Sequence, residues 1–456
     1  MAEPRPLEFL LDVMREHHDR TMMMFLGAPH TYGALADAVL RHLEELPRQG
    51  VAPGTVVGLN ADYSPRAVAL LLALVANSNI VVPLVRPKSG IMEQRLRIAE
   101  VEVLVTVDGQ EAVDVRSLTH HASHRYYSVL READSPGLIL FTSGTSGEPK
   151  AAVHDFSRLL KKFRRRRGSL RTLNFLMFDH WGGLNTLFHT LSNAALVLPV
   201  PDRDPEAVCA AIQQYRVELL PASPTFLNLL LVSEAYARYD LSSLRLITYG
   251  TEPMPETTLR RLVSIFPTAR FQQTYGLIEL GVLQSTSRSN DSLWVKVGGE
   301  GFETRVVDGI LQIKAYSAML GYLNAASPFT EDGWFVTGDQ VEVDGEFIRI
   351  LGRKSELINV GGEKVYPAEV ENIIQEIEDV AEVLVFGESN PLVGSIVCAR
   401  VRPRSDAVDA GELAARIKRY CVERLERYKV PLKIEIVREP QFSDRFKKRR
   451  VGAHSA

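Results

Sequence analysis

The stretch Phe141-Thr142-Ser143-Gly144-Thr145-Ser146-Gly147-Glu148-Pro149-Lys150 follows the short apolar run Gly137–Leu140. Such a run predicts a buried strand. The loop after it suits a polyphosphate, because glycines let backbone N–H groups approach closely, hydroxyls donate hydrogen bonds and lysine supplies positive charge. Pro149 separates the last glycine from Lys150 and an alanine follows, which departs from the Walker pattern G-x-x-x-x-G-K-[ST]. The sequence therefore predicts a nucleotide-phosphate loop in a fold other than that of the P-loop kinases and ATPases.

Length and composition indicate a globular protein of more than one domain. The 456 residues exceed the roughly 250–300 at which a single core stops growing. A hydrophobic fraction of 45% and a net charge of −3 disfavour a disordered chain or a nucleic-acid-binding protein. The three cysteines, Cys209, Cys398 and Cys421, are too few and too scattered for a disulfide framework or a cysteine metal site.

The chain shows no pattern typical of export or membrane insertion. The N-terminus MAEPRPLEFL lacks the basic and then apolar segment of a secretory signal. The longest apolar run, Ala67–Ala76, is well short of the roughly 20 residues that a transmembrane helix needs. We therefore expect a cytoplasmic protein without membrane insertion.

Helical patterns alternate with β-branched runs such as Val56–Leu59 and Ile80–Leu84, and this alternation predicts an α/β fold. Asp344-Gly345 between two such runs predicts a β-hairpin. Residues 372–456 have the pattern of a small α/β domain, whose predicted elements are strands at Val383–Phe386, Ile396–Val401 and Ile434–Val437 and a helix at Leu413–Arg427.

The decapeptide resembles the phosphate-binding loop of the acyl-adenylate-forming superfamily, which comprises acyl- and aryl-CoA synthetases, adenylation domains of nonribosomal peptide synthesis and beetle luciferases. Further family-like strings follow in the family's order, including Gln273–Glu279, Gly333–Asp339 and Leu357–Glu371. The resemblance implies a large multi-subdomain α/β domain over residues 1–353 and a small mobile α+β domain over residues 354–456. The hinge would lie at Ser355, where relatives usually carry aspartate or lysine.

The resemblance also implies roles for individual residues in binding ATP and Mg²⁺. Catalytic roles fall on Thr142, Lys150, Glu279 and Lys447, with Glu279 holding the metal. Nucleotide binding falls on Thr142, Ser143, Gly144, Thr145, Ser146, Gly147, Lys150, Gly250, Thr251, Glu252, Tyr275, Gly276, Asp339 and Arg353. Asp339 matches the ribose-binding aspartate, and Tyr275 the tyrosine that packs against adenine.

The acid-binding region matches two family patterns that differ by one residue. His180–Leu184 matches the His-x-x-Gly-Leu of acyl- and aryl-CoA ligases, which places His180 and Gly183 at the acyl pocket together with Tyr249 and Gly250. Phe178-Asp179 matches the Phe-Asp of amino-acid-activating members, whose carboxylate pairs with a substrate ammonium group. The sequence leaves both alignments open, along with a purely structural role for His180.

Two further positions depart from the family pattern. Ile278 replaces a hydroxyl residue of Tyr-Gly-x-Thr-Glu, and Phe446 replaces the glycine before the catalytic lysine. Lys447 aligns with that lysine, and the adjacent Lys448 is the alternative. Gly361, Gly362 and Lys364 resemble the loop that enters the site for thiol transfer.

The implied reaction joins a carboxylic acid to AMP with release of pyrophosphate and then transfers the acyl group to a thiol. Coenzyme A is the expected acceptor. The alternative is the phosphopantetheine of an acyl carrier protein, which Asp179 and the basic stretch Arg158–Arg167 favour. That stretch is otherwise a solvated helix end or a dock for the 3′-phosphate of coenzyme A. A weakened nucleotide-binding relative is a third reading, motivated by Ile278 and Phe446.

Overall fold

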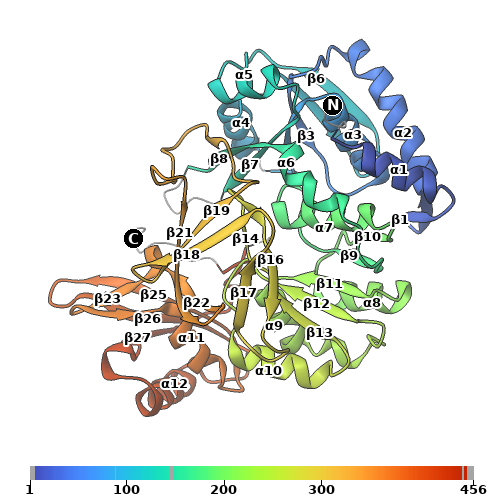
Figure 1. The fold of residues 1–456 in the computed structure, drawn as a ribbon. Helices are drawn as coiled ribbons and strands as arrows, with labels where there is room; N and C mark the ends of the chain where they lie inside the picture. Colours follow the sequence, from blue (N-terminus) through green and yellow to red (C-terminus); the bar gives the residue numbers. More distant parts are fainter. Residues whose placement is uncertain (1–5, 88, 143–147, 444–445, 449–456) are drawn as a thin grey trace.

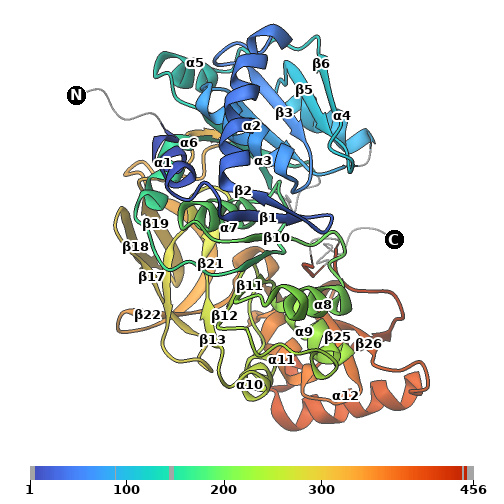
Figure 2. The ribbon, with the colours of Figure 1, turned by 90° about the vertical axis from the view of Figure 1, so that its right-hand side faces the viewer.

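The computed structural model describes residues 6–87, 89–142, 148–443 and 446–448. It is a mixed α/β protein with a larger N-terminal part and a smaller C-terminal part, as the sequence predicts. Figures 1 and 2 both place the C-terminal part against helices α9 (Pro224–Ser233) and α10 (Glu256–Ile265) of the larger part.

The sheet that carries the decapeptide runs in the order β20-β8-β7-β4-β3-β5-β6 within the described residues. Its strands are β3 (Val56–Asn60), β4 (Ile80–Leu84), β5 (Val103–Val107), β6 (Val113–Ser117), β7 (Gly137–Thr142), β8 (Lys150–Asp155) and β20 (Gly321–Tyr322). The accompanying helices are α2 (Tyr32–Glu45), η1 (Pro47–Gln49), α3 (Pro65–Ala76), α4 (Ser89–Ile98) and α5 (Arg125–Glu132). Parallel pairing joins β7, β4, β3 and β5, and the outer pairs are antiparallel.

Helix α3 illustrates how local chemistry sets these elements. Its N-cap Ser64 accepts a hydrogen bond from the Ala67 amide, and Pro65 occupies the first turn. Ala67–Val75 are buried on all sides, so this apolar run is a core helix.

The second sheet of the larger part runs in the order β13-β12-β11-β9-β10-β1-β2, and all its pairs except β1 with β2 are parallel. Its strands are β1 (Thr21–Phe25), β2 (Ala28–Thr31), β9 (Thr172–Asn174), β10 (Val197–Pro199), β11 (Leu219–Ala222), β12 (Leu246–Tyr249) and β13 (Arg270–Gln273). The helical segments in and before this region are α1 (Glu8–Glu16), α6 (Phe156–Leu160), η2 (Lys161–Arg164), α7 (Trp181–Ser192), α8 (Pro205–Tyr215), α9 (Pro224–Ser233), η3 (Ala235–Ala237) and α10 (Glu256–Ile265).

An antiparallel sheet follows in the order β16-β17-β22-β21-β19-β18. Its strands are β16 (Gln284–Ser287), β17 (Trp294–Gly298), β18 (Phe302–Val307), β19 (Ile310–Ala315), β21 (Phe335–Asp344) and β22 (Phe347–Arg353), and the pair β14 (Gly276–Leu277) and β15 (Gly281–Val282) precedes it. The Asp344-Gly345 hairpin is confirmed, because Asp344 pairs with Phe347 and Gly345 has φ 61°.

The C-terminal part packs two helices on a mixed sheet. Its elements are η4 (Lys354–Glu356), β23 (Ile358–Val360), β24 (Glu363–Val365), α11 (Pro367–Gln375), β25 (Val380–Asn390), β26 (Gly394–Pro403), α12 (Ala410–Arg424), η5 (Arg427–Lys429) and β27 (Lys433–Ile436). Strands β25 and β26 exceed their predicted lengths because they pair from Val380↔Pro403 to Asn390↔Gly394, whereas β27 is shifted by one residue from its predicted bounds. Helix α12 begins before the predicted Leu413, because Asp409 caps it by accepting from the Glu412 amide.

Candidate functional site

Several predicted site residues of the larger part lie at or just after the ends of parallel strands. Thr142 ends β7, Tyr249 ends β12, and Thr274-Tyr275-Gly276 follows β13. The Thr274 amide donates to the Tyr249 carbonyl at 2.7 Å, which ties two of these strand ends together. Open α/β sheets bind their ligands outside the carboxyl ends of their strands, so the topology supports a ligand site here.

Asp339 is buried and contacts two other predicted residues, the buried Tyr275 and the exposed Arg353. The Tyr275 hydroxyl donates to Asp339 Oδ2 at 2.6 Å, and Arg353 Nε lies 3.3 Å from Asp339 Oδ1. Asp339 faces Arg353 across β21 and β22, which fixes this pair through the backbone. Burial raises the pKa of the Asp339 carboxyl, and Arg353 opposes that rise. Burial, then the charge of Asp339, also raises the pKa of Tyr275 well above its usual value.

A second carboxylate, Glu279, is held beside the end of the decapeptide. The Tyr322 hydroxyl donates to Glu279 Oε1 at 2.5 Å, and Lys150 Nζ lies 5.5 Å from the centre of the Tyr322 ring. Thr142 and Lys150 face each other in the β7–β8 ladder. Asn324 bonds the Pro149 carbonyl and the Ala151 amide, each at 3.0 Å. Ser143, Gly144, Thr145, Ser146 and Gly147 lie outside the described residues.

Close backbone approach explains two of the predicted glycines. A Cβ at Gly250 would lie 2.6 Å from the Thr274 carbonyl oxygen, and one at Gly183 would lie 2.1 Å from the Met177 carbonyl oxygen. Thr251, next to Gly250, has φ 75°, which is an outlier for a β-branched residue. Such strain concentrates at functional sites, and it supports a ligand-binding role for this turn.

The acid-binding region separates the two alignments. His180 caps α7, its Nδ1 accepting from the Gly182 amide at 3.0 Å, and it lines a cavity described below. Asp179 is 4% exposed and lies 3.4 Å from Arg95 Nη1. Its carboxylate is therefore already compensated by a cation of this chain. The Tyr249 side chain is 1% exposed within the core, so it packs the fold instead of lining the cavity.

The two neighbouring lysines near the C-terminal end face different surroundings. Lys447 lines the same cavity as His180 and Thr251. Lys448 Nζ instead lies 2.6 Å from Glu371 Oε2, a carboxylate of α11 that is 3% exposed and also accepts from the Val385 amide. Lys448 thus anchors the segment to its own domain, while Lys447 is presented to the larger part.

Glu252, predicted to bind nucleotide, also contacts both parts of the protein. Its Oε1 accepts from the Thr225 amide at 2.8 Å, and its Oε2 is 3.4 Å from the Lys448 amide. The carboxylate therefore links the turn after β12 to the start of α9 and to the C-terminal segment.

The cavity shared by these residues is narrow, at about 20 Å³, and it is lined by Phe175, Leu176, Met177, His180, Arg203, Thr251, Phe446 and Lys447. Since this is about the room that one water molecule needs, an acid can bind among these residues only when they move apart. Two of the eight come from the C-terminal part, so a movement of that part would open the cavity.

The predicted thiol-transfer loop lies at the surface in this arrangement. Gly361 and Gly362 form the turn between β23 and β24 with φ 61° and 95°, and Lys364 is exposed. Positive φ at both turn residues is the requirement of a type I′ hairpin. The predicted hinge Ser355 is exposed in η4. The structure thus brings Lys447, and not this loop, to the cavity.

Among the described residues, no group of three or more His, Cys, Asp or Glu side chains could hold a metal ion. One carboxylate, that of Glu279, is enough to fit a magnesium ion, because this hard cation keeps several waters and commonly takes the rest of its ligands from substrate phosphates.

Sequence reasoning missed Tyr322, Asn324, Arg95 and Arg203, whose partners are distant in the chain. A tyrosine or asparagine carries no local signal for such a contact.

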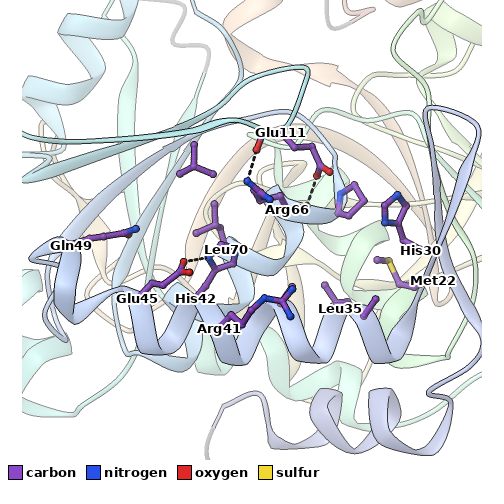
Figure 3. Close-up of a pocket in the computed structure, with 14 residues that line it drawn as sticks. Met22, His30, Leu35, Arg41, His42, Glu45, Gln49, Arg66, Leu70 and Glu111 are labelled. Atoms are coloured by element: carbon purple, nitrogen blue, oxygen red, sulfur yellow. Dashed lines mark hydrogen bonds and ion pairs between the residues drawn. The ribbon is translucent and has the colours of Figure 1, made fainter.

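Figure 3 shows a larger cavity, of about 330 Å³, between α2, the start of α3 and the Glu111–Val113 segment. Glu111 accepts from the Arg66 amide at 2.7 Å, and His42 lies 3.0 Å from Glu45. None of the motif residues lines this cavity, so its size does not make it the candidate site.

The basic stretch is partly neutralised by neighbouring carboxylates. Arg158 lies 3.3 Å from Asp155, and Arg166 pairs with Glu16. Lys162 Nζ donates to the Val282 carbonyl at 2.8 Å, and burial lowers its pKa to about 7. These contacts fit a helix end packed on the larger part, and docking of a phosphate or carrier protein stays a prediction.

In the part of the chain that the structure describes, every helix is too short or too polar to cross a membrane.

Comparison with known proteins agrees with this architecture. The chain is 28% identical to an indoleacetate–CoA ligase of Aromatoleum aromaticum, with 92% of each chain covered. It is also 28% identical to a 2-succinylbenzoate–CoA ligase of Bacillus cereus, with 91% of each covered.

Solved structures show the same fold. An anthranilate CoA ligase in complex with anthranoyl-AMP superposes with a TM-score of 0.82 at 20% identity, covering 97% of this chain and 95% of the other. The o-succinylbenzoate CoA synthetase from Bacillus subtilis, in complex with its acyl-adenylate intermediate, gives 0.78 at 22% identity, with 98% of each chain covered.

Two family descriptions match the sequence itself. The description "AMP-binding enzyme" matches residues 10–310, and "AMP-binding enzyme C-terminal domain" matches residues 369–444. The first match alone spans well over half of the chain. The chain therefore belongs to the AMP-binding enzyme family and has the adenylate-forming enzyme fold.

Proposed function

We propose that this enzyme is an AMP-forming acid–thiol ligase. It joins a carboxylic acid to the α-phosphate of ATP, releases pyrophosphate, and transfers the acyl group to coenzyme A. The observation that carries the proposal is the meeting of Lys447, from the far end of the chain, with His180 and Thr251 in one cavity of the larger part. The relatives named as CoA ligases, which match over nearly their whole length, support the same reaction.

The residues divide the first half-reaction among them. Asp339, ionised, accepts from the ribose hydroxyls, and Tyr275 and Arg353 hold its carboxylate in place. Lys150 and Lys447 place positive charge where negative charge grows on the α-phosphate. Magnesium bound at Glu279 would add charge stabilisation at the phosphates. The acid needs no general base, since a carboxylic acid with a pKa of about 4–5 is already ionised at neutral pH.

Coenzyme A is the favoured thiol because the carrier-protein alternative loses one of its supports. Asp179 favours that alternative only through pairing with a substrate ammonium group, and Asp179 is buried beside Arg95. His180, which the ligase pattern places at the acyl pocket, does line the cavity.

The test is a screen of carboxylic acids for pyrophosphate release with ATP and Mg²⁺, followed by mass spectrometry after addition of coenzyme A. Aromatic acids come first, because the similar ligases are named for indoleacetate, 2-succinylbenzoate and anthranilate. We expect AMP, pyrophosphate and an acyl-CoA in equal amounts. A thioester that forms only on an added carrier protein would reject the coenzyme A assignment, and absence of pyrophosphate with all acids would leave the nucleotide-binding reading.

A further inference from the structure

The residue before Lys447 has an unusual backbone conformation for its type. Phe446 has φ 50°, in the left-handed region that glycine adopts readily and bulky side chains avoid. The Phe446 amide donates to the Ser443 carbonyl at 2.8 Å, and the Ser443 amide donates to the Lys447 carbonyl at 2.9 Å. These bonds tie Ser443 to Phe446 and Lys447, and Phe446 has the positive φ that glycine usually supplies at a tight turn. A phenylalanine here must be held by contacts of its side chain.

The ring of Phe446 makes those contacts with the other domain. Its centre lies 5.3 Å from the Phe175 ring and 5.5 Å from the Phe226 ring, both in the core of the second sheet. Phe442, on the same C-terminal segment, stacks on it at 5.5 Å. Aromatic pairs at this spacing are attractive beyond the area that they bury.

Polar contacts secure the same point from both sides. Ser223, the cap of α9, donates through its hydroxyl to the Phe446 carbonyl at 2.8 Å. Two residues further along, Lys448 returns to Glu371 of the C-terminal domain. The segment therefore contacts the larger domain at Phe446 and through the Lys448 amide, while the Lys448 side chain returns to its own domain, and Lys447 lies between the two anchors.

We infer that Phe446 is an aromatic latch that holds the C-terminal domain in the acid-activating arrangement and so limits thiol transfer. The inference rests on the proposed function and on the domain rotation that the family resemblance implies, in which the Gly361–Lys364 loop replaces Lys447. Turning withdraws Phe446 from Phe175, Phe226 and Ser223. Because each contact favours one arrangement only, the latch shifts the equilibrium between the two. A weaker latch raises the small population that can transfer the acyl group.

Three substitutions separate the ring from the backbone strain. Phe446→Gly removes the ring and relieves the strain, Phe446→Ala removes the ring and keeps the strain, and Phe446→Leu keeps an apolar side chain. We expect Phe446→Gly to speed thiol transfer from supplied acyl-AMP about tenfold, as population arithmetic predicts for a rare second state. Phe446→Ala behaves similarly, and Phe446→Leu stays near wild type.

A measurement of domain position provides a readout that needs no turnover. Leu392 and Val129 are exposed on different domains, and the native cysteines are buried, so Leu392→Cys and Val129→Cys accept a fluorophore pair cleanly. Single-molecule energy transfer should show one dominant arrangement in the parent and about a tenfold larger second population with Phe446→Gly.

The outcomes are distinct. If Phe446→Gly enlarges the population of the second domain arrangement but the enzyme turns over no acid, the latch is supported and the proposed function is wrong. An unchanged population with Phe446→Gly overturns the latch, and so does a parallel fall of both half-reactions, which indicates a structural role alone. Unchanged transfer despite a shifted population overturns the claim that the latch limits transfer.

Discussion

Lys447 and Lys448 are adjacent, yet the structure predicts opposite consequences for removing their charges. Substitution by methionine keeps most of each aliphatic stem and deletes the ammonium group, so Lys447→Met and Lys448→Met form a matched pair. Lys447 lines the candidate cavity, whereas Lys448 neutralises the buried Glu371. The first change should damage chemistry and the second should damage stability.

The magnitudes follow from these surroundings. Removing one charge that stabilises the transition state costs about 3–4 kcal/mol, which is roughly 10²–10³-fold in the rate of acyl-AMP formation. Breaking a buried ion pair costs about 3–5 kcal/mol. Lys448 is 21% exposed and Glu371 keeps the Val385 amide, so we place Lys448→Met near the lower limit, at about 3 kcal/mol of unfolding free energy.

Three assays distinguish the variants: pyrophosphate release for the first half-reaction, thiol transfer from supplied acyl-AMP for the second, and urea unfolding for stability. Lys447→Met should lose only the first half-reaction. Lys448→Met should unfold at lower urea and keep both half-reactions while it is folded. If Lys448→Met abolishes acyl-AMP formation without loss of stability, the lysine register is off by one. If neither variant affects that step, the catalytic-lysine assignment is wrong.

Three further predictions concern other residues. Asp339→Asn should raise the KM for ATP at least about tenfold, because a charge-assisted contact to ribose is lost. Since the pKa of Asp339 is raised above 3.8, the ATP affinity of the wild type should fall as the pH drops through that raised value. If the variant loses ATP affinity at low pH in the same way, the assignment of Asp339 is wrong. His154 is buried, and burial lowers its pKa from 6.5 to about 4, so the free energy of unfolding should fall by about 3 kcal/mol between pH 6.5 and 4 as the unfolded chain takes up the proton; urea unfolding of His154→Gln should show a flatter pH dependence, and an unchanged slope would contradict this. Gly362→Leu should slow thiol transfer more than tenfold while sparing acyl-AMP formation, whereas Gly362→Asn, which tolerates positive φ, should act as a mild control; equal loss in both half-reactions would point to misfolding.

The parts of the fold that the sequence predicts are those with local signals. The apolar run before the decapeptide forms β7, and Asp344-Gly345 forms the predicted hairpin between β21 and β22, because hydrophobic pattern and turn chemistry act within a few residues. The order of the family-like strings along the chain predicts the division into a larger N-terminal part and a smaller C-terminal part.

The rest of the site depends on contacts between distant residues. Arg95 meets Asp179 across 84 positions, and Tyr322 reaches Glu279 across 43. No local pattern distinguishes Lys447 from Lys448, because their difference arises only when the segment before them packs between two domains. In the sequence, Phe446 is a departure from the family pattern because it replaces a glycine. In the structure, its ring makes an aromatic contact between the two domains.

The central claim is that the acid is activated as an acyl-adenylate. The most direct measurement uses an acid that the screen identifies, labelled with ¹⁸O in its carboxylate, together with ATP, Mg²⁺ and coenzyme A. Attack of a carboxylate oxygen on the α-phosphate, followed by thiol displacement of AMP, leaves that oxygen on the phosphate of AMP. We predict AMP with one ¹⁸O, in equal amount to acyl-CoA and unlabelled pyrophosphate. Label in inorganic phosphate with formation of ADP, or unlabelled AMP beside acyl-CoA, would contradict the account.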